Sequence, residues 1–280
     1  MKTVRHLTLA AALGLVALNV SAANVLVVLS DADHLDLKED KVFATGFYLN
    51  ELMQPVKRLL DAGHQVTFAT PNGLAPTLDK SSDDKMYFNN DDAALQAHRA
   101  LLEKLQLTSR TASPVISLAR AEQIGYDHFD ALYIPGGHAP MQDLLTSKAL
   151  GKALTLFHAA HKPTALVCHG PVALLSTLPD AAAFTQQLAD KGQASLQPGW
   201  IYAGYRMTVI SNAEEEKAKS LLSGGVMKFY PQTALQQAGG KYSSNVTPFT
   251  PHVVTDRELI TGQNPASASG VAAELLKRLK

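Results

Sequence analysis

Short, continuously apolar segments alternate with amphipathic segments over most of the chain. Residues 24–30, 65–70 and 129–135 are apolar runs with the length and character of strands buried in a parallel sheet. Residues 47–60 and 147–161 carry apolar side chains at the spacing of one helix face. Because a strand, a helix and a second strand in this order form a right-handed parallel unit, the pattern predicts an α/β fold with a mostly parallel sheet.

The stretch from about 74 to 128 interrupts this alternation. It is polar around 79–92 and then helical in pattern over 93–107. We interpret it as an inserted helical and loop segment that packs beside the sheet, and as a candidate lid. Its low aromatic content argues against a separate domain with its own core, so we expect residues 24–280 to form one domain.

The pattern is less regular in the last third of the chain. Residues 205–211 are predicted to form a strand, followed by a helix with Asn212 as its N-cap. The glutamates at 214–216 fall in the first turn of that helix, where carboxylates favour the helix dipole, so we interpret them as capping residues. Residues 259–265 are interpreted as a turn-rich connection.

The first 23 residues have a composition of their own. Met1–Arg5 is basic, Leu7–Val20 is apolar, and Ser21–Ala23 offers small residues for cleavage. The apolar run is short for a membrane span. This arrangement predicts a signal peptide over residues 1–23 and an exported, periplasmic chain with no membrane anchor after cleavage.

The composition excludes some classes of partner. The chain has 280 residues, 46% of them hydrophobic, and is therefore long enough to bury a sizeable core. Its 25 Lys and Arg balance its 25 Asp and Glu, so no charge bias indicates binding to nucleic acid or to an anionic membrane.

Cys168 is the only cysteine and lies at a predicted strand-to-helix corner. The apolar residues 165–167 precede it, and Gly170 and Pro171 then open a helix. Such a corner places a side chain at the carboxyl edge of the sheet beside a helix N-terminus, which favours a thiolate. Since one cysteine cannot form a disulfide within the chain, Cys168 is either an inert buried residue or a functional thiol, and its position favours function.

Two glycines and a histidine directly follow one of the predicted strands, as Gly136, Gly137 and His138. Two glycines let backbone amides approach a ligand closely, as an oxyanion hole requires, although a plain tight turn has the same sequence. His158 and His161 have a spacing found in metal sites, but no third ligand is evident, so we predict no metal site. The chain has no glycine fingerprint for a nucleotide.

Four segments in the same order resemble the DJ-one/PfpI superfamily, which has the class I glutamine amidotransferase-like fold. They are Thr45–Leu52 followed by Pro55, Ile134–His138 followed by Asp143-Leu144, Cys168–Pro171, and Thr261–Ala268. Within the superfamily the chain is most similar to the branch of heat-inducible holding chaperones and glutathione-independent glyoxalases. The resemblance runs from about residue 24 to the C-terminus.

The resemblance implies a flavodoxin-like three-layer sandwich and assigns roles to single residues. Cys168 matches the nucleophile, Glu51 the acid that hydrogen-bonds its thiol, and His169 the neighbouring histidine. The loop of Gly136, Gly137 and His138 matches the oxyanion and substrate site, with amides near Gly137 and His169 as donors. Without the resemblance, Glu51 would be interpreted as a solvated helix residue.

The chain departs from the branch at several positions. Asn50 stands where a second acidic residue is usual, and Tyr48 where tryptophan is common. Some members complete a triad with a later acid, for which Asp180, Asp190 and the region of Glu214 are all candidates. Whether His169 moves protons or only shapes the pocket is also left open.

The resemblance implies a lyase-type activity that converts small 2-oxoaldehydes such as methylglyoxal to 2-hydroxy acids with no cofactor. A cysteine amidase or peptidase, a periplasmic holding chaperone and a sulfur-oxidation sensor are the alternatives. Glutamine hydrolysis is not expected, because His252 lacks the following glutamate of the amidotransferase His-x-Glu pair. The expected partner is a small aldehyde, and a homodimer is one candidate for the oligomeric state.

Overall fold

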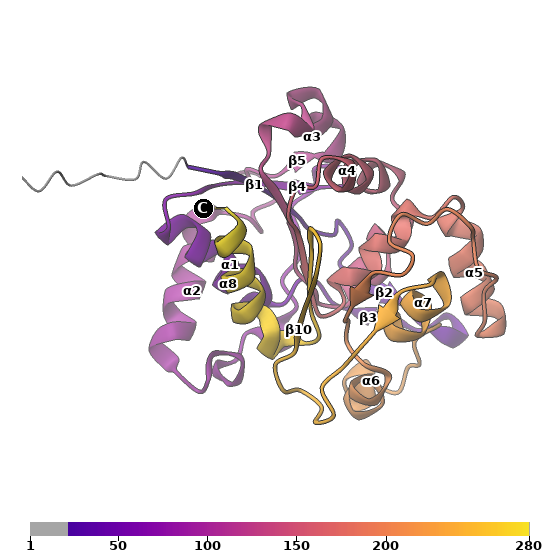
Figure 1. The fold of residues 1–280 in the computed structure, drawn as a ribbon. Helices are drawn as coiled ribbons and strands as arrows, with labels where there is room; N and C mark the ends of the chain where they lie inside the picture. The colour runs from indigo at the N-terminus through magenta and orange to yellow at the C-terminus, as the bar shows by residue number, and fades with distance from the viewer. Residues whose placement is uncertain (1–21, 280) are drawn as a thin grey trace, which may run out of the picture.

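A seven-stranded sheet runs through the centre of the molecule, with helices on both faces (Figure 1). The computed structural model describes residues 22–279, so residues 1–21 of the predicted signal peptide lie outside the described residues. The strands follow the order β10-β11-β7-β6-β1-β4-β5, and only β10 is antiparallel to its neighbour. Their bounds are β1 (Asn24–Val28), β4 (Gln65–Thr70), β5 (Ile116–Ser117), β6 (Ala131–Ile134), β7 (Thr164–Val167), β10 (Val253–Asp256) and β11 (Leu259–Gly262). The predicted α/β class is confirmed.

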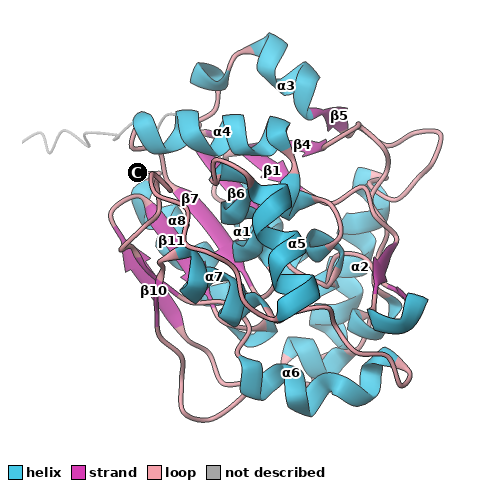
Figure 2. Ribbon diagram, turned by 90° about the vertical axis from the view of Figure 1, so that its right-hand side faces the viewer, coloured by secondary structure: helices cyan, strands magenta, loops and turns pink. Residues whose placement is uncertain are grey.

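Helices cover the sheet in two groups (Figures 1 and 2). On one face α1 packs against α2 and α8, and α4, α5 and α7 lie on the other face. The helix bounds are α1 (Leu49–Asp61), α2 (Asp92–Leu105), α3 (Leu118–Ile124), α4 (Lys148–Ala159), α5 (Ala181–Lys191), α6 (Asn212–Ala218), α7 (Pro231–Ala238) and α8 (Ala268–Arg278). Figure 2 shows α3 and α6 at opposite ends of the molecule. Within residues 22–279 no helix has the length and apolar character needed to cross a bilayer.

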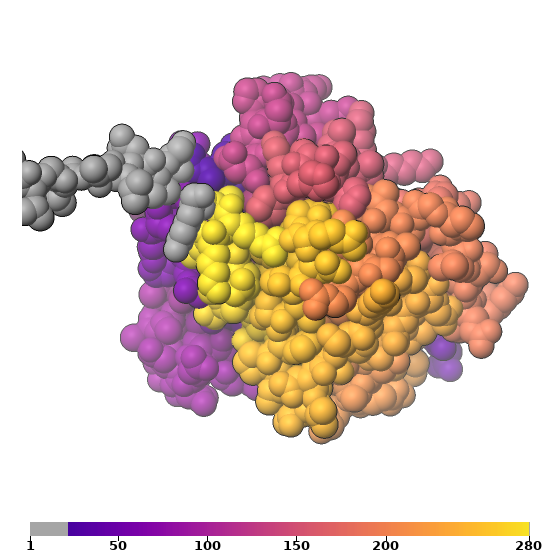
Figure 3. All heavy atoms as spheres, in the orientation of Figure 1, coloured from indigo at the N-terminus to yellow at the C-terminus, as the bar shows by residue number. Residues whose placement is uncertain are grey.

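The register of the parallel strands brings three loops to one edge of the sheet. Ile134 of β6 lies opposite Leu166 of β7, and Val167 of β7 lies opposite Gly262 of β11. The loops that follow β6, β7 and β11 therefore begin side by side. Ligands of open α/β sheets bind at this carboxyl edge. In the space-filling view, the last part of the chain, gold to yellow, lies between the indigo-to-purple first part of the chain and the orange segment (Figure 3).

The core strands are buried on both faces, as their continuous apolar sequence predicts. The side chains of β6 and β7 are all buried, and those of β1 are buried after its first residue. At about 25 cal/mol per Å² of apolar surface removed from water, burial of this kind is the main stabilising contribution. The same packing holds the strand ends, and hence the loops of the site, in fixed positions.

The stretch 74–128 contributes to both the sheet and a helical layer. Its helix α2 lies within two residues of the predicted 93–107 helix and packs on α1. Its short strand β5 pairs in parallel with β4 and so extends the sheet by one strand. The sequence pattern does not predict β5, because two residues are too few to show a period. The domain boundaries themselves stay a prediction.

Two predictions for the last third of the chain are wrong. Residues 259–262 form the buried strand β11 between β7 and β10, although they were interpreted as turn-rich; their hydrogen-bond partners come from distant segments that local sequence does not reveal. Of residues 205–211, only Arg206–Met207 form a strand, β8. It pairs with β9 (Lys241–Tyr242) in a separate small sheet.

Candidate active site

Cys168 occupies a strained corner at the carboxyl end of β7. Its φ is 58°, in the left-handed region that a non-glycine residue rarely adopts. The backbone is held on both sides, since the Cys168 amide donates to the Gly262 carbonyl at 2.9 Å and the Ile210 amide donates to the Cys168 carbonyl at 3.1 Å. A 3₁₀ helix, Gly170–Thr177, begins two residues later. The predicted strand-to-helix corner is therefore present, and hydrogen bonds to β11 and to the loop before α6 hold its strained backbone.

The fully buried Glu51 side chain, on the first turns of α1, faces the same corner. Its Oε2 accepts a hydrogen bond of 2.8 Å from the Gly136 amide. A Cβ added at Gly136 would lie 2.5 Å from this oxygen and 2.7 Å from the Cys168 Cβ. Only glycine therefore leaves room for the carboxyl and the cysteine to approach each other. Glu51 and Cys168 are 117 residues apart in the sequence. The absence of a side chain at Gly136 lets them lie close together in the fold.

A proline and a tyrosine position the backbone of Glu51. Pro55 lies inside α1 and has no N–H, so the Glu51 carbonyl loses its helical partner four residues on. The Tyr133 hydroxyl, from the buried strand β6, donates to this carbonyl instead. An unpaired buried carbonyl costs about 1–3 kcal/mol, so this contact both satisfies the helix and ties Glu51 to the central sheet.

Burial sets the protonation of Glu51 and Cys168. It raises the pKa of Glu51 to about 8, although the Cys168 thiol and the Gly136 amide favour the charged form. Burial, followed by the charge of Glu51, also raises the pKa of the Cys168 thiol well above its usual value. The expectation that the helix N-terminus would favour a thiolate is therefore wrong for the free protein, because desolvation outweighs it. At pH 7 a protonated carboxyl faces a thiol.

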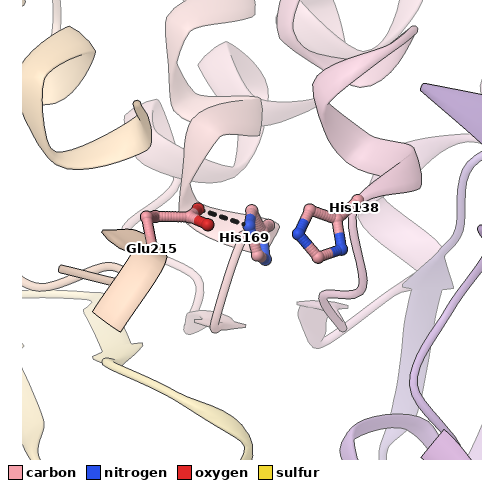
Figure 4. Close-up of side chains that lie close together, drawn as sticks. All are labelled: His138, His169 and Glu215. Atoms are coloured by element: carbon pink, nitrogen blue, oxygen red, sulfur yellow. Dashed lines mark hydrogen bonds and ion pairs between the residues drawn. The ribbon is translucent and has the colours of Figure 1, made fainter. Parts of the chain in front are cut away.

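His169 and Glu215 extend the site away from the sulfur. The Cys168 Sγ lies 3.3 Å from His169 Nδ1, and His169 Nε2 lies 2.7 Å from Glu215 Oε1 (Figure 4). Glu215 comes from α6. Burial alone would raise the pKa of Glu215, but the charge and hydrogen bond of His169 outweigh it and hold the pKa below its usual value. The three side chains have the order of nucleophile, base and orienting acid that cysteine hydrolases and related enzymes use.

Sequence analysis left the acid open, and the geometry places Glu215 at that position. Asp180 caps α5 by accepting from the Ala183 amide, and Asp190 accepts a hydrogen bond from Gln186 at the surface. Neither contacts His169 among the hydrogen bonds and ion pairs of residues 22–279. The acidic run was interpreted as capping, which is wrong for Glu215.

Glu214, the neighbour of Glu215, has a structural task. It forms a capping box with Ser211, so Ser211 rather than the predicted Asn212 is the N-cap of α6. The buried carboxylate of Glu214 also accepts hydrogen bonds from Gln263 and Asn264, in the loop after β11. These contacts hold α6 against the sheet edge, and this position of α6 places Glu215 beside His169.

The loop after β6 lines the other side of the cysteine. Gly137 has a φ of 85°, and a Cβ there would lie 2.0 Å from the Gly46 carbonyl oxygen, so the loop requires glycine. The Gly136 amide is engaged by Glu51 and is not a free oxyanion donor. The amides of Gly137 and His169 donate no hydrogen bond to any part of the described chain. They are therefore the candidate oxyanion donors.

His138 lies against the ring of His169. The two ring centroids are 4.2 Å apart. Burial, and then the charge of His169, lowers the pKa of His138 to about 4, so its ring is neutral at pH 7. His158 pairs with the buried Glu258 at 2.7 Å and lies outside the site.

A pocket of about 660 Å³ opens above Cys168. Its floor contains Cys168, His138, His169 and Glu215. Its walls combine side chains from four regions of the chain: Tyr48, Asn50, Gln54, Ser81, Met86, Tyr87, Asn89, Ile210, Lys217, Ala218, Ser220, Leu221, Phe249, Pro251, Pro265, Ala266 and Ser269. The stretch 81–89 of the predicted lid forms one wall. The region of Glu214 was one candidate for the acid, but its place in the pocket wall was not predicted, because the position of α6 depends on the fold around Glu214.

Comparisons with known sequences show what the chain is similar to. Residues 43–220 match the family model described as ThiJ/PfpI family-like. The chain is 27% identical over 272 residues to a probable glutathione-independent glyoxalase of Schizosaccharomyces pombe, which covers 91% of this chain and 98% of that protein. It is 25% identical over 248 residues to the protein/nucleic acid deglycase HchA of Staphylococcus aureus, over 88% of this chain and 76% of that protein.

Two solved structures have a fold similar to that of this chain. Glyoxalase III from Candida albicans has a TM-score of 0.61 and 18% identity to this chain, over 92% of this chain and 98% of that one. The rapid encystment protein of Francisella tularensis has a TM-score of 0.65 and 23% identity, over 92% and 99% of the two chains. At these identities the likeness concerns the fold alone.

Proposed function

Because the chain belongs to the ThiJ/PfpI family, we propose that it is a cysteine-dependent enzyme that converts small 2-oxoaldehydes such as methylglyoxal to 2-hydroxy acids without glutathione. One observation carries the proposal: Cys168 lines the pocket and lies between the protonated Glu51, which is buried beside it, and the His169–Glu215 pair. Two proton-transfer groups on opposite sides of a nucleophile suit a reaction that moves a proton between adjacent carbons. A relative named as a glutathione-independent glyoxalase adds support.

The first half of the proposed reaction forms a carbon–sulfur bond. His169 takes the thiol proton across the 3.3 Å contact, and Glu215 stabilises the imidazolium. The sulfur then attacks the aldehyde carbon. The amides of Gly137 and His169 stabilise the oxyanion, and the Glu51 carboxyl protonates it to give a hemithioacetal.

The second half is an internal oxidation and reduction. The Glu51 carboxylate takes the proton from the former aldehyde carbon while the His169 imidazolium protonates the ketone oxygen, which gives an enediol. Glu51 returns its proton to the second carbon and His169 takes the hydroxyl proton, which leaves a thioester. Water, deprotonated by Glu51, then cleaves the thioester, and His169 reprotonates the sulfur. The aldehyde carbon is oxidised, the ketone carbon is reduced, and one water is consumed, so no external oxidant is needed.

The size of the pocket favours a second candidate at the same site. A volume of about 660 Å³ far exceeds that of a three-carbon aldehyde. The same cysteine can act on a hemiaminal, the adduct of such an aldehyde with an amine of a protein or nucleobase. The sulfur displaces the amine at the former aldehyde carbon, Glu51 protonates the departing nitrogen, and the hemithioacetal that forms reacts as above. The relative named as a protein/nucleic acid deglycase is consistent with this candidate. Release of free amine from such an adduct, at a rate above that of free aldehyde consumption, would favour it.

The test is consumption of methylglyoxal by purified protein in the absence of glutathione, beside Cys168→Ser and Glu51→Gln. Glu122→Gln, at an exposed position on α3, is the matched control. We expect activity in the wild type and the control, and loss in both site variants. Activity that persists in Cys168→Ser contradicts the proposal, and hydrolysis of unblocked peptides in its place supports the peptidase alternative.

We also propose that the protein acts after export, in the periplasm. The basic, apolar and small-residue pattern of residues 1–23 supports this proposal. Fractionation of cells that produce the full chain, with mass spectrometry of the mature N-terminus, tests it. A product that retains Met1 and stays in the cytoplasmic fraction contradicts export.

A further inference from the structure

Three buried side chains converge on one point beside the cysteine. His138, His169 and Glu215 each offer one ligand atom, and the three atoms lie within 4.8 Å of one another (Figure 4). Their residues are 4%, 3% and 3% exposed, respectively. They come from the loop after β6, the corner after β7 and α6, so the fold rather than local sequence assembles them.

His138 has no partner in this arrangement. Its Nδ1 is buried without a hydrogen bond, and its other ring nitrogen, Nε2, is the one that Figure 4 shows directed toward His169 and Glu215. Neither nitrogen of the ring takes part in a hydrogen bond or an ion pair with any residue of the range 22–279. The Nε2 atom is therefore the one that a ligand between the three side chains can reach, and no protein group of the described chain occupies it. His138 also has no role in the proton transfers proposed above.

We propose that His138, His169 and Glu215 form a binding site for a divalent transition-metal ion of the Zn²⁺ type, and that the bound ion inhibits the Cys168 chemistry. Two imidazoles and one carboxylate are a donor set typical of zinc sites with one open position. Hard cations such as Mg²⁺ and Ca²⁺ prefer oxygen ligands, so they are not expected to compete. The proposal departs from the expectation, drawn from sequence, of no metal site.

The distances require only small movements. Bonds of about 2.0–2.1 Å at tetrahedral angles place two ligand atoms about 3.3 Å apart. The His169 Nε2 and Glu215 Oε1 atoms are 2.7 Å apart and must separate slightly. Every ligand atom already lies within 4.8 Å of the other two, so any approach that is needed is small. The His138 ring makes no hydrogen bond in the described structure and is held by packing against the rings of Phe43 and His169, so a small adjustment of this packing can supply the approach.

Inhibition follows from shared residues. An ion bound to His169 Nε2 leaves the proton of the ring on Nδ1, so Nδ1 cannot accept the thiol proton. The ion also binds the Glu215 carboxylate, which can then no longer stabilise an imidazolium. This consequence rests on the proposed function, whereas metal binding does not. A protein that binds Zn²⁺ but consumes no aldehyde would refute the proposed function and leave the metal site standing.

The binding test titrates Zn²⁺ alone against a chromophoric chelator in the presence of the purified full-length protein. We expect one site per chain, and at least a tenfold loss of affinity in His138→Asn and in Glu215→Gln. His128→Asn, at an exposed position, is the matched control and should bind as the wild type does. Cys168→Ser should also retain the site, because the sulfur is not among the three ligands.

A second measurement separates site loss from misfolding. Co²⁺ bound to the wild type and to Cys168→Ser should give the same visible spectrum, with intense tetrahedral bands and no thiolate-to-metal charge transfer. Absence of stoichiometric binding, wild-type affinity in His138→Asn, or binding lost only in Cys168→Ser would each overturn the proposal. In an active preparation, Zn²⁺ should inhibit reversibly with chelator, and less strongly in His138→Asn than in wild type.

Discussion

The contact between His169 and Glu215 gives the most quantitative prediction. The two atoms lie 2.7 Å apart and both side chains are almost completely buried, at 4% and 2% exposure. The substitution Glu215→Gln keeps the shape and removes the charge that stabilises the imidazolium formed when His169 takes the thiol proton. A hydrogen bond to a charged group contributes about 1.5–3 kcal/mol, which corresponds to a rate loss of about 10- to 150-fold.

Two assays measure this loss. The first is kcat/KM for methylglyoxal without glutathione, and the second is the rate of alkylation of Cys168 by iodoacetamide, which needs no assumption about the substrate. Glu216→Gln is the matched control, since Glu216 is the next residue on α6 and is exposed. We expect both rates to fall in Glu215→Gln only. Equal rates in the two variants would refute the role assigned to Glu215.

Three further substitutions test the surroundings of the site. Glu51→Gln should flatten the pH dependence of stability. The pKa of Glu51 in the folded protein, about 8, lies above the usual 4.5, so the stability that Glu51 contributes is complete below pH 4.5 and is lost as the pH rises through 8. A variant whose melting temperature follows that of the wild type across this range contradicts the prediction. Gly137→Ala should cost more than about 1 kcal/mol in urea unfolding, given its positive φ and its contact with Gly46, and wild-type stability would refute the strain. Tyr133→Phe should cost about 1–3 kcal/mol by orphaning the Glu51 carbonyl; an unchanged urea midpoint would show that this carbonyl finds another partner.

Sequence patterns predict the elements that depend on local apolar periodicity. The strands β1, β4 and β6 and the helices α1, α2 and α4 all lie within the predicted ranges or within two residues of them. The corner at Cys168 follows from an apolar run that meets Gly170 and Pro171. Strand β11 was missed because its four residues gain their structure from β7 and β10 on either side.

The site was predictable in part. Glu51 carries no local sign of burial, and only the resemblance to a family connected it with Cys168. Glu215 stands in a run of three glutamates at a helix start, and the sequence gives no means to separate the one that caps from the one that faces His169. Burial of the thiol is a property of the whole fold, which is why its raised pKa was not predicted.

The central claim is that Cys168 converts a 2-oxoaldehyde to a 2-hydroxy acid by itself, with no thiol cofactor. Proton NMR of methylglyoxal incubated with the purified protein in glutathione-free buffer, beside Cys168→Ser, tests it most directly. The account predicts stoichiometric appearance of lactate with the wild type and none above background with Cys168→Ser. Lactate formed equally by both proteins, or methylglyoxal that persists unchanged with the wild type, would contradict it.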